Sequence, residues 1–234
     1  MKNPFKLLDK RDWIVYVISL VVVIASNVAT LQFDALNFFS TIIGVTALIF
    51  IAKGNVWGQI LSVIFCTLYG IISLRFRYYG EMITYLGMSL PIAIFSIVTW
   101  VKNPYKKGEN VVKIRKFTLF EGVMMLLLAV GVTFAFYFIL RAFNTPNLIV
   151  STLSVITSFC AAYLMLRRIT YYAIAYALND IILIILWVLA TIENIIYLPV
   201  VACFLIFLLN DLYAFVSWRV REKYQLKESE KKDK

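Results

Sequence analysis

The stretch YYAIAYALNDIILIILWVLAT, residues 171–191, is apolar at every position except Asn179, Asp180 and Thr191. A run of about 20 apolar residues is the length that an α-helix needs to cross the hydrocarbon core of a bilayer. Asn179 and Asp180 stand near the middle of the run, at the depth where polar side chains are most costly and tend to mark function. This stretch therefore predicts an integral membrane protein and the place of its site.

The composition of the whole chain supports the same class. Of its 234 residues 62% are apolar and 15% are charged, and the mean hydropathy is +0.85. Soluble domains are nearer 45–50% apolar and 25% charged. A soluble fold of this length would expose apolar patches that cause aggregation. Lipid is therefore the expected solvent.

Seven further apolar runs are long enough to span a bilayer, with short connections between most of them. Together with the first, they cover residues 13–31, 36–52, 56–74, 79–101, 118–140, 148–166, 171–191 and 196–218. The segment 102–117 is a longer, basic loop that contains Asn103-Pro104 and Lys107-Gly108. The chain is predicted to be an all-α integral membrane protein of about eight transmembrane helices.

The basic residues give these spans an orientation. If the N-terminus is cytoplasmic and eight spans alternate across the membrane, 20 of the 23 Lys and Arg residues fall on the cytoplasmic side. The three on the outer side are Arg75, Arg77 and Arg141. Cytoplasmic loops of membrane proteins carry such an excess of positive charge. The formal charge of +10 thus reflects topology rather than a nucleic-acid partner, and both ends are expected in the cytoplasm.

Spans two to four and six to eight form a weak internal repeat. Each triplet has a basic corner, an aromatic residue opening the next span, a later tyrosine and a closing tryptophan. The matching positions, 115 to 118 residues apart, are Trp57 and Tyr172, Tyr79 and Tyr197, and Trp100 and Trp218. One span, 118–140, lies between the triplets, so the two copies point the same way. This is the 3+1+3 parallel-repeat pattern of some transporters, whose sites lie between the repeats.

The repeat predicts how the chain is divided. Residues 1–35 form the cytoplasmic N-terminus and an extra transmembrane helix, and residues 36–101 form the first three-helix repeat. Residues 102–147 form the cytoplasmic loop and a linker helix, residues 148–220 the second repeat, and residues 221–234 a charged, solvated cytoplasmic tail.

Helical spacing predicts a binding stripe in the seventh span. Tyr172, Tyr176, Asp180 and Trp187 share roughly one helix face, with Asn179 beside it. Aromatic faces for stacking, an amide and a carboxylate would suit a planar, polar and possibly cationic ligand. The alternative is that Asn179 and Asp180 only join helices.

Other candidate binding residues lie in three more spans. They are Trp57, Gln59 and Tyr69 in the third span, Glu81 and Tyr85 in the fourth, and Asn210 in the eighth. Glu81 lies near the outer interface, where simple solvation would also explain it. The pair Asn210-Asp211 fits either a gate or a clamp between helices, and Asn210 is taken as the binding candidate.

Enzyme chemistry is not indicated. The chain has no histidine, no G-x-S-x-G and no phosphate- or dinucleotide-binding fingerprint. Cys66, Cys160 and Cys203 are scattered through apolar runs without C-x-x-C spacing, as buried hydrophobic residues would be. No cofactor and no metal ion are therefore expected.

Four stretches of sequence resemble the PnuC family of bacterial nicotinamide riboside transporters. They are KGNVWGQ (53–59), YGEMITYLGM (79–88), WVKNPY (100–105) and YAIAYALND (172–180), followed by Trp187. The resemblance runs over most of residues 36–220. It implies a SWEET-like 3+1+3 core and a homotrimer in the bacterial inner membrane. It also implies that nicotinamide riboside moves down its gradient and that a cytosolic kinase traps it by phosphorylation.

One motif departs from the family. Its pattern W-x-x-W-x-x-x-N reads Tyr172-x-x-Ala175-x-x-x-Asn179 here. The asparagine is kept, but one tryptophan is a tyrosine and the other is lost, so Tyr176 or Trp187 is expected to supply the aromatic face. The departure leaves thiamine or riboflavin open as alternative substrates. A proton-coupled transporter that uses Asp180 and a non-transporting scaffold or sensor remain the other hypotheses.

Overall fold

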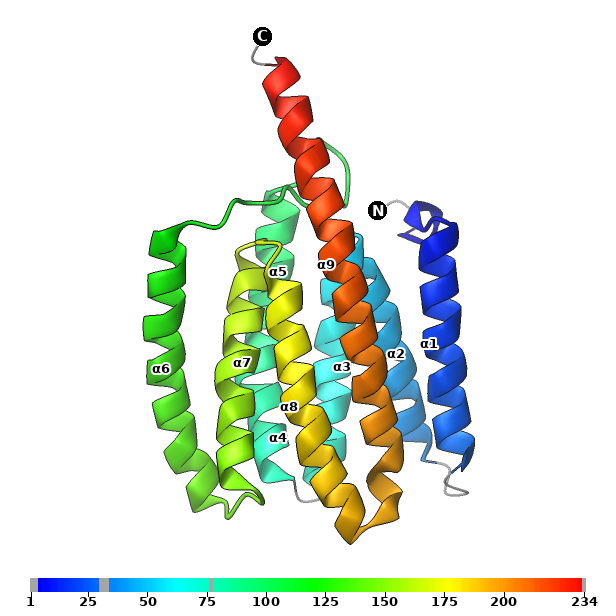
Figure 1. Ribbon diagram of the computed structural model, residues 1–234, viewed down its shortest axis with the longest axis vertical. Helices are drawn as coiled ribbons and strands as arrows, with labels where there is room; N and C mark the ends of the chain where they lie inside the picture. The colour runs from blue at the N-terminus through cyan, green and yellow to red at the C-terminus, as the bar shows by residue number, and fades with distance from the viewer. Residues whose placement is uncertain (1–3, 30–33, 76–77, 233–234) are drawn as a thin grey trace.

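Long helices running side by side make up the computed structural model, which describes residues 4–29, 34–75 and 78–232 (Figure 1). Within these residues eight segments are long and apolar enough to cross a membrane. The helices are α1 (Lys10–Ala29), α2 (Ala35–Ala52), α3 (Val56–Arg75), α4 (Tyr79–Ile83), α5 (Leu90–Lys102), α6 (Leu119–Ala142), α7 (Leu148–Leu166), α8 (Tyr172–Glu193) and α9 (Leu198–Lys232). Short 3₁₀ turns lie at Pro4–Leu7 and Ile195–Tyr197. The predicted multi-pass, all-helical membrane fold is confirmed.

The fourth span is not a uniform α-helix. Between α4 and α5 the backbone forms a π-helix, Thr84–Ser89, in which the N–H of Leu90 donates to the carbonyl of Tyr85. Pro91 follows at the start of α5 and has no N–H to donate to the preceding turn. π-Helical segments are rare in proteins, and those that occur are often found at functional sites.

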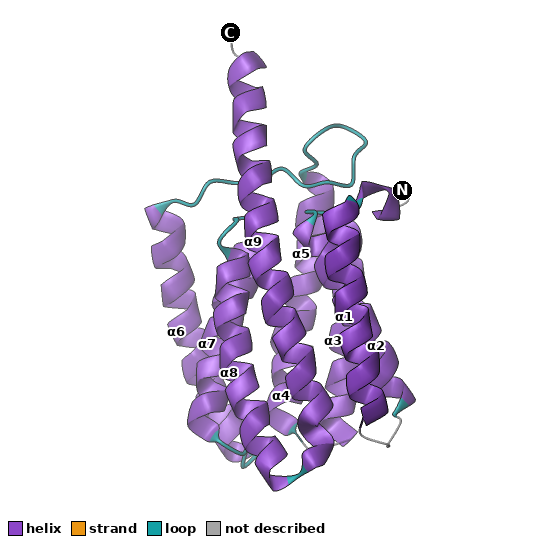
Figure 2. Ribbon diagram, turned by 45° about the vertical axis from the view of Figure 1, so that its right-hand side comes forward, coloured by secondary structure: helices purple, strands orange, loops and turns teal. Residues whose placement is uncertain are grey.

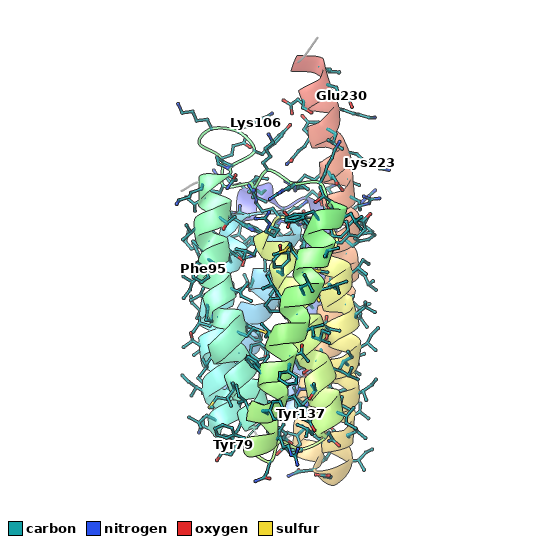
Figure 3. All side chains as sticks on the ribbon, turned by 90° about the vertical axis from the view of Figure 1, so that its left-hand side faces the viewer. Tyr79, Phe95, Lys106, Tyr137, Lys223 and Glu230 are labelled. Atoms are coloured by element: carbon teal, nitrogen blue, oxygen red, sulfur yellow. The ribbon has the colours of Figure 1, made fainter. Side chains whose placement is uncertain are left out.

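Both chain ends lie at the same end of the bundle, as an even number of spans requires (Figures 1 and 2). The loop 103–117 is at this end, together with the charged Lys106, Lys223 and Glu230 (Figure 3). Phe95 points outward between the two ends, and Tyr79 and Tyr137 lie toward the opposite end. The charge distribution is the one that the positive-inside rule describes. Arg77 and the predicted end of the first span at residue 31 fall outside the described residues.

Helix α9 continues well past the bilayer-length part of the chain and ends only at Lys232. The sequence predicts a solvated tail over 221–234, but most of it is helical and packs on the loop. The Gln225 side chain accepts a hydrogen bond from the N–H of Ile114 at 2.9 Å and donates one to the carbonyl of Val112 at 3.2 Å. Lys and Glu favour a helix, and these bonds give the extension a partner.

Helices α1 and α6 lie at opposite flanks of the bundle in Figure 1. Side chains of α6 such as Leu119, Phe120 and Phe134 are largely exposed. Helix α1 is attached by polar contacts instead: Lys53 pairs with Asp12 at 2.5 Å, and Tyr16 bonds to Thr46 at 3.0 Å. The remaining spans enclose the interior where the site lies.

The ends of the two predicted repeats contact each other reciprocally. Trp100 donates from Nε1 to the carbonyl of Met165, and Trp218 donates from Nε1 to the carbonyl of Ile51. The two indole rings lie 5.7 Å apart. Each tryptophan therefore hydrogen-bonds to the first helix of the other triplet. Such reciprocal contacts are expected of two parallel copies related by an axis along the membrane normal.

Candidate functional site

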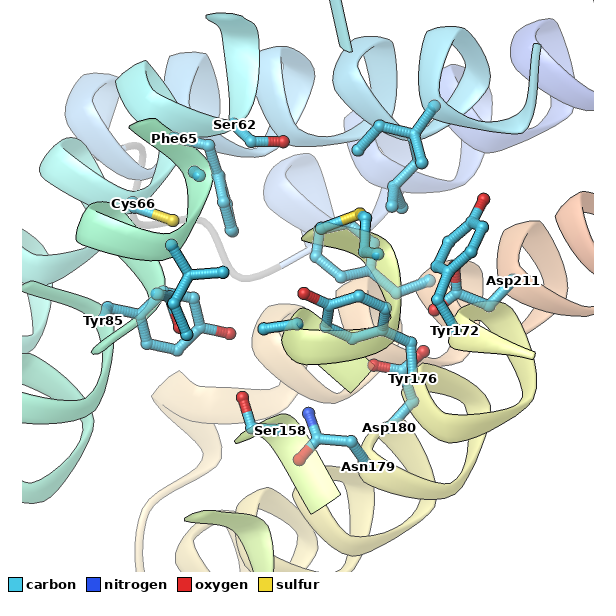
Figure 4. Close-up of a pocket in the computed structure, with 18 of the residues that line it drawn as sticks. Ser62, Phe65, Cys66, Tyr85, Ser158, Tyr172, Tyr176, Asn179, Asp180 and Asp211 are labelled. Atoms are coloured by element: carbon cyan, nitrogen blue, oxygen red, sulfur yellow. The ribbon is translucent and has the colours of Figure 1, made fainter. Parts of the chain in front are cut away.

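A cavity in the interior of the bundle is lined by residues from α2, α3, the π-helix, α5, α7, α8 and α9. The hydroxyl groups of Tyr85, Tyr176 and Ser158 and the amide of Asn179 point toward its centre (Figure 4). Cavities of this type, mostly apolar with a few convergent polar groups, are the usual form of small-molecule sites.

Helix α8 supplies most of the polar groups. Tyr172, Tyr176, Asn179 and Asp180 all line the cavity because their spacing places them on the inward face of the helix. Asn179 is 4% exposed, and its Oδ1 accepts a hydrogen bond from Thr157 Oγ1 on α7 at 2.9 Å. This bond fixes the amide so that its N–H donors are directed into the cavity (Figure 4).

A second carboxyl group, that of Asp211 on α9, lies beside Asp180. Both residues are 3% exposed, both line the cavity, and their carboxyl groups interact electrostatically. Neither is among the ion pairs of the described residues. The sequence predicts Asn210 as a candidate but not Asp211. The available signal was an acidic residue inside an apolar run, and only the rotation of α9 shows which of the two faces inward.

Aromatic side chains complete the other side of the cavity. Tyr85 comes from the π-helix, and its ring lies 6.0 Å from that of Phe65 on α3. The Phe65 ring contacts that of Phe207 on α9 at 5.7 Å. These rings could stack on a planar ligand that meets the polar groups of α8.

Comparisons with known proteins identify the family of the chain. Residues 34–220 match the family described as nicotinamide mononucleotide transporter. The chain belongs to this family. It is a membrane transporter and not an enzyme, as the sequence predicts.

Two relatives illustrate the membership. The transporter is 23% identical over 184 residues to the nicotinamide riboside transporter PnuC of Neisseria mucosa, which covers 76% of this chain and 70% of the relative. Its fold matches the crystal structure of the vitamin B3 transporter PnuC with a TM-score of 0.80 and 20% identity, over 93% of this chain and 94% of that one.

Three pairs of residues in the cavity lining have the same separation along the chain, one member of each pair in each predicted repeat. Positions 62 and 176, 65 and 179, and 66 and 180 are each 114 residues apart, and all six line the cavity. The first repeat contributes Ser62, Phe65 and Cys66 where the second contributes Tyr176, Asn179 and Asp180. One half of the cavity is therefore mainly apolar, and the other is polar and acidic.

Trp187 and Glu81 lie away from this cavity. The ring of Trp187 packs on Tyr78 at 4.8 Å and on Tyr197 at 5.6 Å, near the end opposite to the termini. Glu81 is 5% exposed and lines a separate cleft with Glu193. Seven residues are close to two helical turns, so Trp187 keeps nearly the direction of Asp180 but lies about 10 Å further along α8, beyond the cavity.

The remaining candidates are buried but do not line the cavity. Gln59 is fully buried, with no partner for either side-chain polar atom among the described residues, and the Nε1 of the half-buried Trp57 also has none. Tyr69 packs against Tyr85 at 4.4 Å, behind the lining. Asn210 donates to Ser19 Oγ on α1 at 2.9 Å, so it acts as a clamp between helices.

Proposed function

We propose that this transporter carries nicotinamide riboside by facilitated diffusion and that phosphorylation of the substrate in the cytosol drives uptake. The family match and the name of the Neisseria relative support the class of substrate. The site itself supports the choice within that class. It binds one planar ring between an apolar and a polar wall, and it needs no ATP-binding part.

The charge of the cavity carries the proposal. Two carboxyl groups, Asp180 and Asp211, line it, and no Lys or Arg does among the described residues. Nicotinamide riboside carries a positive pyridinium ring, whereas the mononucleotide adds a phosphate, which would be repelled by the carboxyl groups and would find no cation. The family description names the mononucleotide, and the relative's name gives the riboside. This site favours the riboside.

Each side chain then has a definite role. The amide of Asn179 bonds to the carboxamide of nicotinamide, because its own oxygen is already held by Thr157 and its donors are free. Tyr176, Tyr85 and Phe65 stack on the pyridinium or surround it, as aromatic rings do with cationic ligands. Trp187 and Glu81 lie on the approach from the opposite end.

The proposal includes an assembly and a location. The transporter sits in the bacterial inner membrane with both termini in the cytoplasm, which the charge distribution supports. The SWEET-like repeat, supported by the Trp100 and Trp218 contacts, brings the two halves of the site together. A homotrimer is part of the proposal on the basis of the family resemblance.

Counterflow in proteoliposomes tests the function. Purified protein is reconstituted with unlabelled nicotinamide riboside inside, and labelled riboside is added outside, without ATP and with equal pH on both sides. Transient accumulation of label is expected, with competition by unlabelled riboside but not by the mononucleotide. Liposomes without protein are the control. Binding without flux would indicate a sensor, and competition by the mononucleotide at equal concentration would contradict the charge argument.

Thiamine is the second candidate, because its thiazolium ring is also cationic and would suit the two carboxyl groups. Riboflavin has a neutral ring system and lacks this advantage. The same counterflow assay distinguishes them: preferential exchange of labelled thiamine would reassign the substrate while leaving the role of the acidic wall intact.

A further inference from the structure

The pair formed by Asp180 and Asp211 has an unusual environment for two acids. The groups come from different helices, α8 and α9, and each is buried by at least nine-tenths. Both carboxyl groups line the same cavity and interact with each other, and a hydrogen bond between two carboxyl groups requires a proton. Two ionised carboxylates that line one small cavity in a low-dielectric interior would repel each other strongly.

The surroundings offer the pair no positive charge. The titratable groups that face it are Tyr172 and Tyr176 on α8, Tyr85 on the π-helix, Cys66 on α3 and Cys203 on α9, all neutral near pH 7. The lining residues of α2, α5 and α7 are not titratable. Among the described basic groups, Arg221 interacts with Tyr172, and none interacts with Asp180 or Asp211.

Two buried polar atoms at the pair lack a hydrogen-bond partner among the described residues. Asp180 Oδ2 is buried and has no hydrogen-bond partner in the described part of the chain. The hydroxyl of Tyr172, which is fully buried and lines the same cavity, has no hydrogen-bond partner there. Such unsatisfied buried groups cost free energy unless a ligand or water engages them.

We propose that Asp180 and Asp211 hold two protons when the cavity is empty and one when a positively charged ring occupies it. This inference rests on the proposed function and adds a chemical consequence: binding of a cationic substrate releases one proton. The O–H bond of one carboxyl breaks, its electron pair stays on that oxygen, and the proton leaves to water. The remaining proton bridges the two groups, and their single negative charge faces the ring.

The exchange keeps the site electrically neutral in both states. An empty site with a net negative charge, or a loaded site with a net positive charge, would have to cross the membrane interior at a large electrostatic cost. With one proton exchanged for one cation, neither state carries a net charge. At equal pH on the two sides, the condition of the counterflow assay above, the substrate gradient alone sets the direction of net movement.

The sign of the pH dependence follows from the proton count. The loaded site binds one proton fewer than the empty site, so raising the pH favours binding. Affinity for the cationic ring is expected to rise by up to about tenfold per pH unit. It levels off where the empty pair has itself lost a proton. Binding of a neutral ring releases no proton, so its affinity is expected not to change with pH.

Calorimetry of the detergent-purified, full-length protein tests the proposal. Nicotinamide riboside and its neutral reduced form, dihydronicotinamide riboside, are titrated at pH 6, 7 and 8 in buffers with different ionisation enthalpies. The dependence of heat on buffer counts the protons. About one proton released by the cationic form and none by the reduced form supports the proposal. Binding of the cationic form with no proton release overturns it.

Variants locate the proton. D180N/D211N is expected to release none and to bind the cationic form at least tenfold more weakly, while binding of the reduced form shows that the variant is folded. E230Q, which removes a charge from the distant exposed end of α9, is the control and should release one proton as the parent does. Undiminished release from a D180N/D211N protein that binds the reduced form overturns the assignment. If the double variant does not fold, the count for the parent protein decides.

Thiamine and riboflavin separate this inference from the proposed function. If nicotinamide riboside does not bind but thiamine binds with release of a proton, the substrate assignment falls and the carboxyl pair stands. If only neutral riboflavin binds, both fall.

Discussion

At the residue scale, Asn179 is the side chain that we propose binds the carboxamide of the ligand. Thr157 on the neighbouring helix occupies its oxygen, and burial removes competing water. The amide donors are then the groups left to bind a ligand, in a place where an unmade hydrogen bond is costly. The bond to Thr157 also joins α7 to α8, so the variants below distinguish a ligand-binding role from a purely structural one.

Replacing Asn179 by Ala is therefore expected to weaken binding of nicotinamide riboside by about 1–3 kcal/mol, since the carboxamide of the ligand loses its partner. Thr157→Val should give a smaller loss, because the amide remains but is no longer held. Calorimetric affinity measures both. Thr67→Ala is the control, because Thr67 is exposed and bonds only to its own helix at Val63. Unchanged affinity in the Asn179 variant would move the site elsewhere.

At the scale of helices, close contact between α2 and α3 sets the geometry of the first repeat. A Cβ at Gly58 would lie 2.6 Å from the backbone N of Ile51 and 2.9 Å from the carbonyl O of Ala47. These are backbone atoms and cannot turn aside as a flexible side chain can. Glycine is required there so that the two helices can approach.

Gly58→Ala is expected to destabilise the protein by about 1–3 kcal/mol or more, because the helices must separate. Thermal unfolding in detergent should show a lower midpoint temperature. Gly131→Ala on α6 is the matched control, since no atom would lie within 4 Å of its Cβ and alanine favours a helix. A Gly58 variant as stable as the Gly131 variant would contradict the packing.

The attachment of α1 depends on a buried charge pair. Asp12 is fully buried and contacts both Lys53 at 2.5 Å and the hydroxyl of Tyr213. Removing one partner of a buried pair leaves an uncompensated charge.

Lys53→Met is thus expected to destabilise the protein by about 3–5 kcal/mol. The midpoint of thermal unfolding measures the effect. Lys53→Met/Asp12→Leu, which removes both charges, should recover much of the loss, and Lys107→Met in the exposed part of the loop should have no effect. Equal stability of the single and double variants would show that the pair contributes nothing.

At the scale of the whole molecule, the loop 103–117 leads from α5 to α6 and contacts both predicted repeats at the end that holds the termini. The N–H of Val112 donates to the carbonyl of Gly54, and the N–H of Arg115 donates to the carbonyl of Arg168. These acceptors stand at the equivalent corners of the two triplets, and both corners have a positive φ, 64° and 62°. The loop thus binds both halves of the bundle on one side of the membrane.

The shared end of the loop and the termini, together with the positive charge there, predicts which side of the membrane each loop occupies. A green fluorescent protein fused after Lys234 should fluoresce, and alkaline phosphatase inserted after Asn144 should be active, because the first requires the cytoplasm and the second the outer side. Phosphatase inserted after Gly108 is the control and should be inactive. The reverse pattern would invert the topology.

The sequence by itself determined the class, the eight spans and a sorted charge pattern, because hydropathy and charge are properties of each segment alone. It also predicted which residues of α8 line the cavity, except for Trp187, since positions on one helix face follow from its period. Tertiary structure decided the rest. It placed Asp211 rather than Asn210 in the cavity, moved Trp187 to the outer aromatic cluster and continued α9 through the charged tail. Those outcomes depend on how each helix is rotated and how far it is shifted along its axis against its neighbours, and on the loop that packs against the end of α9, which several segments decide together.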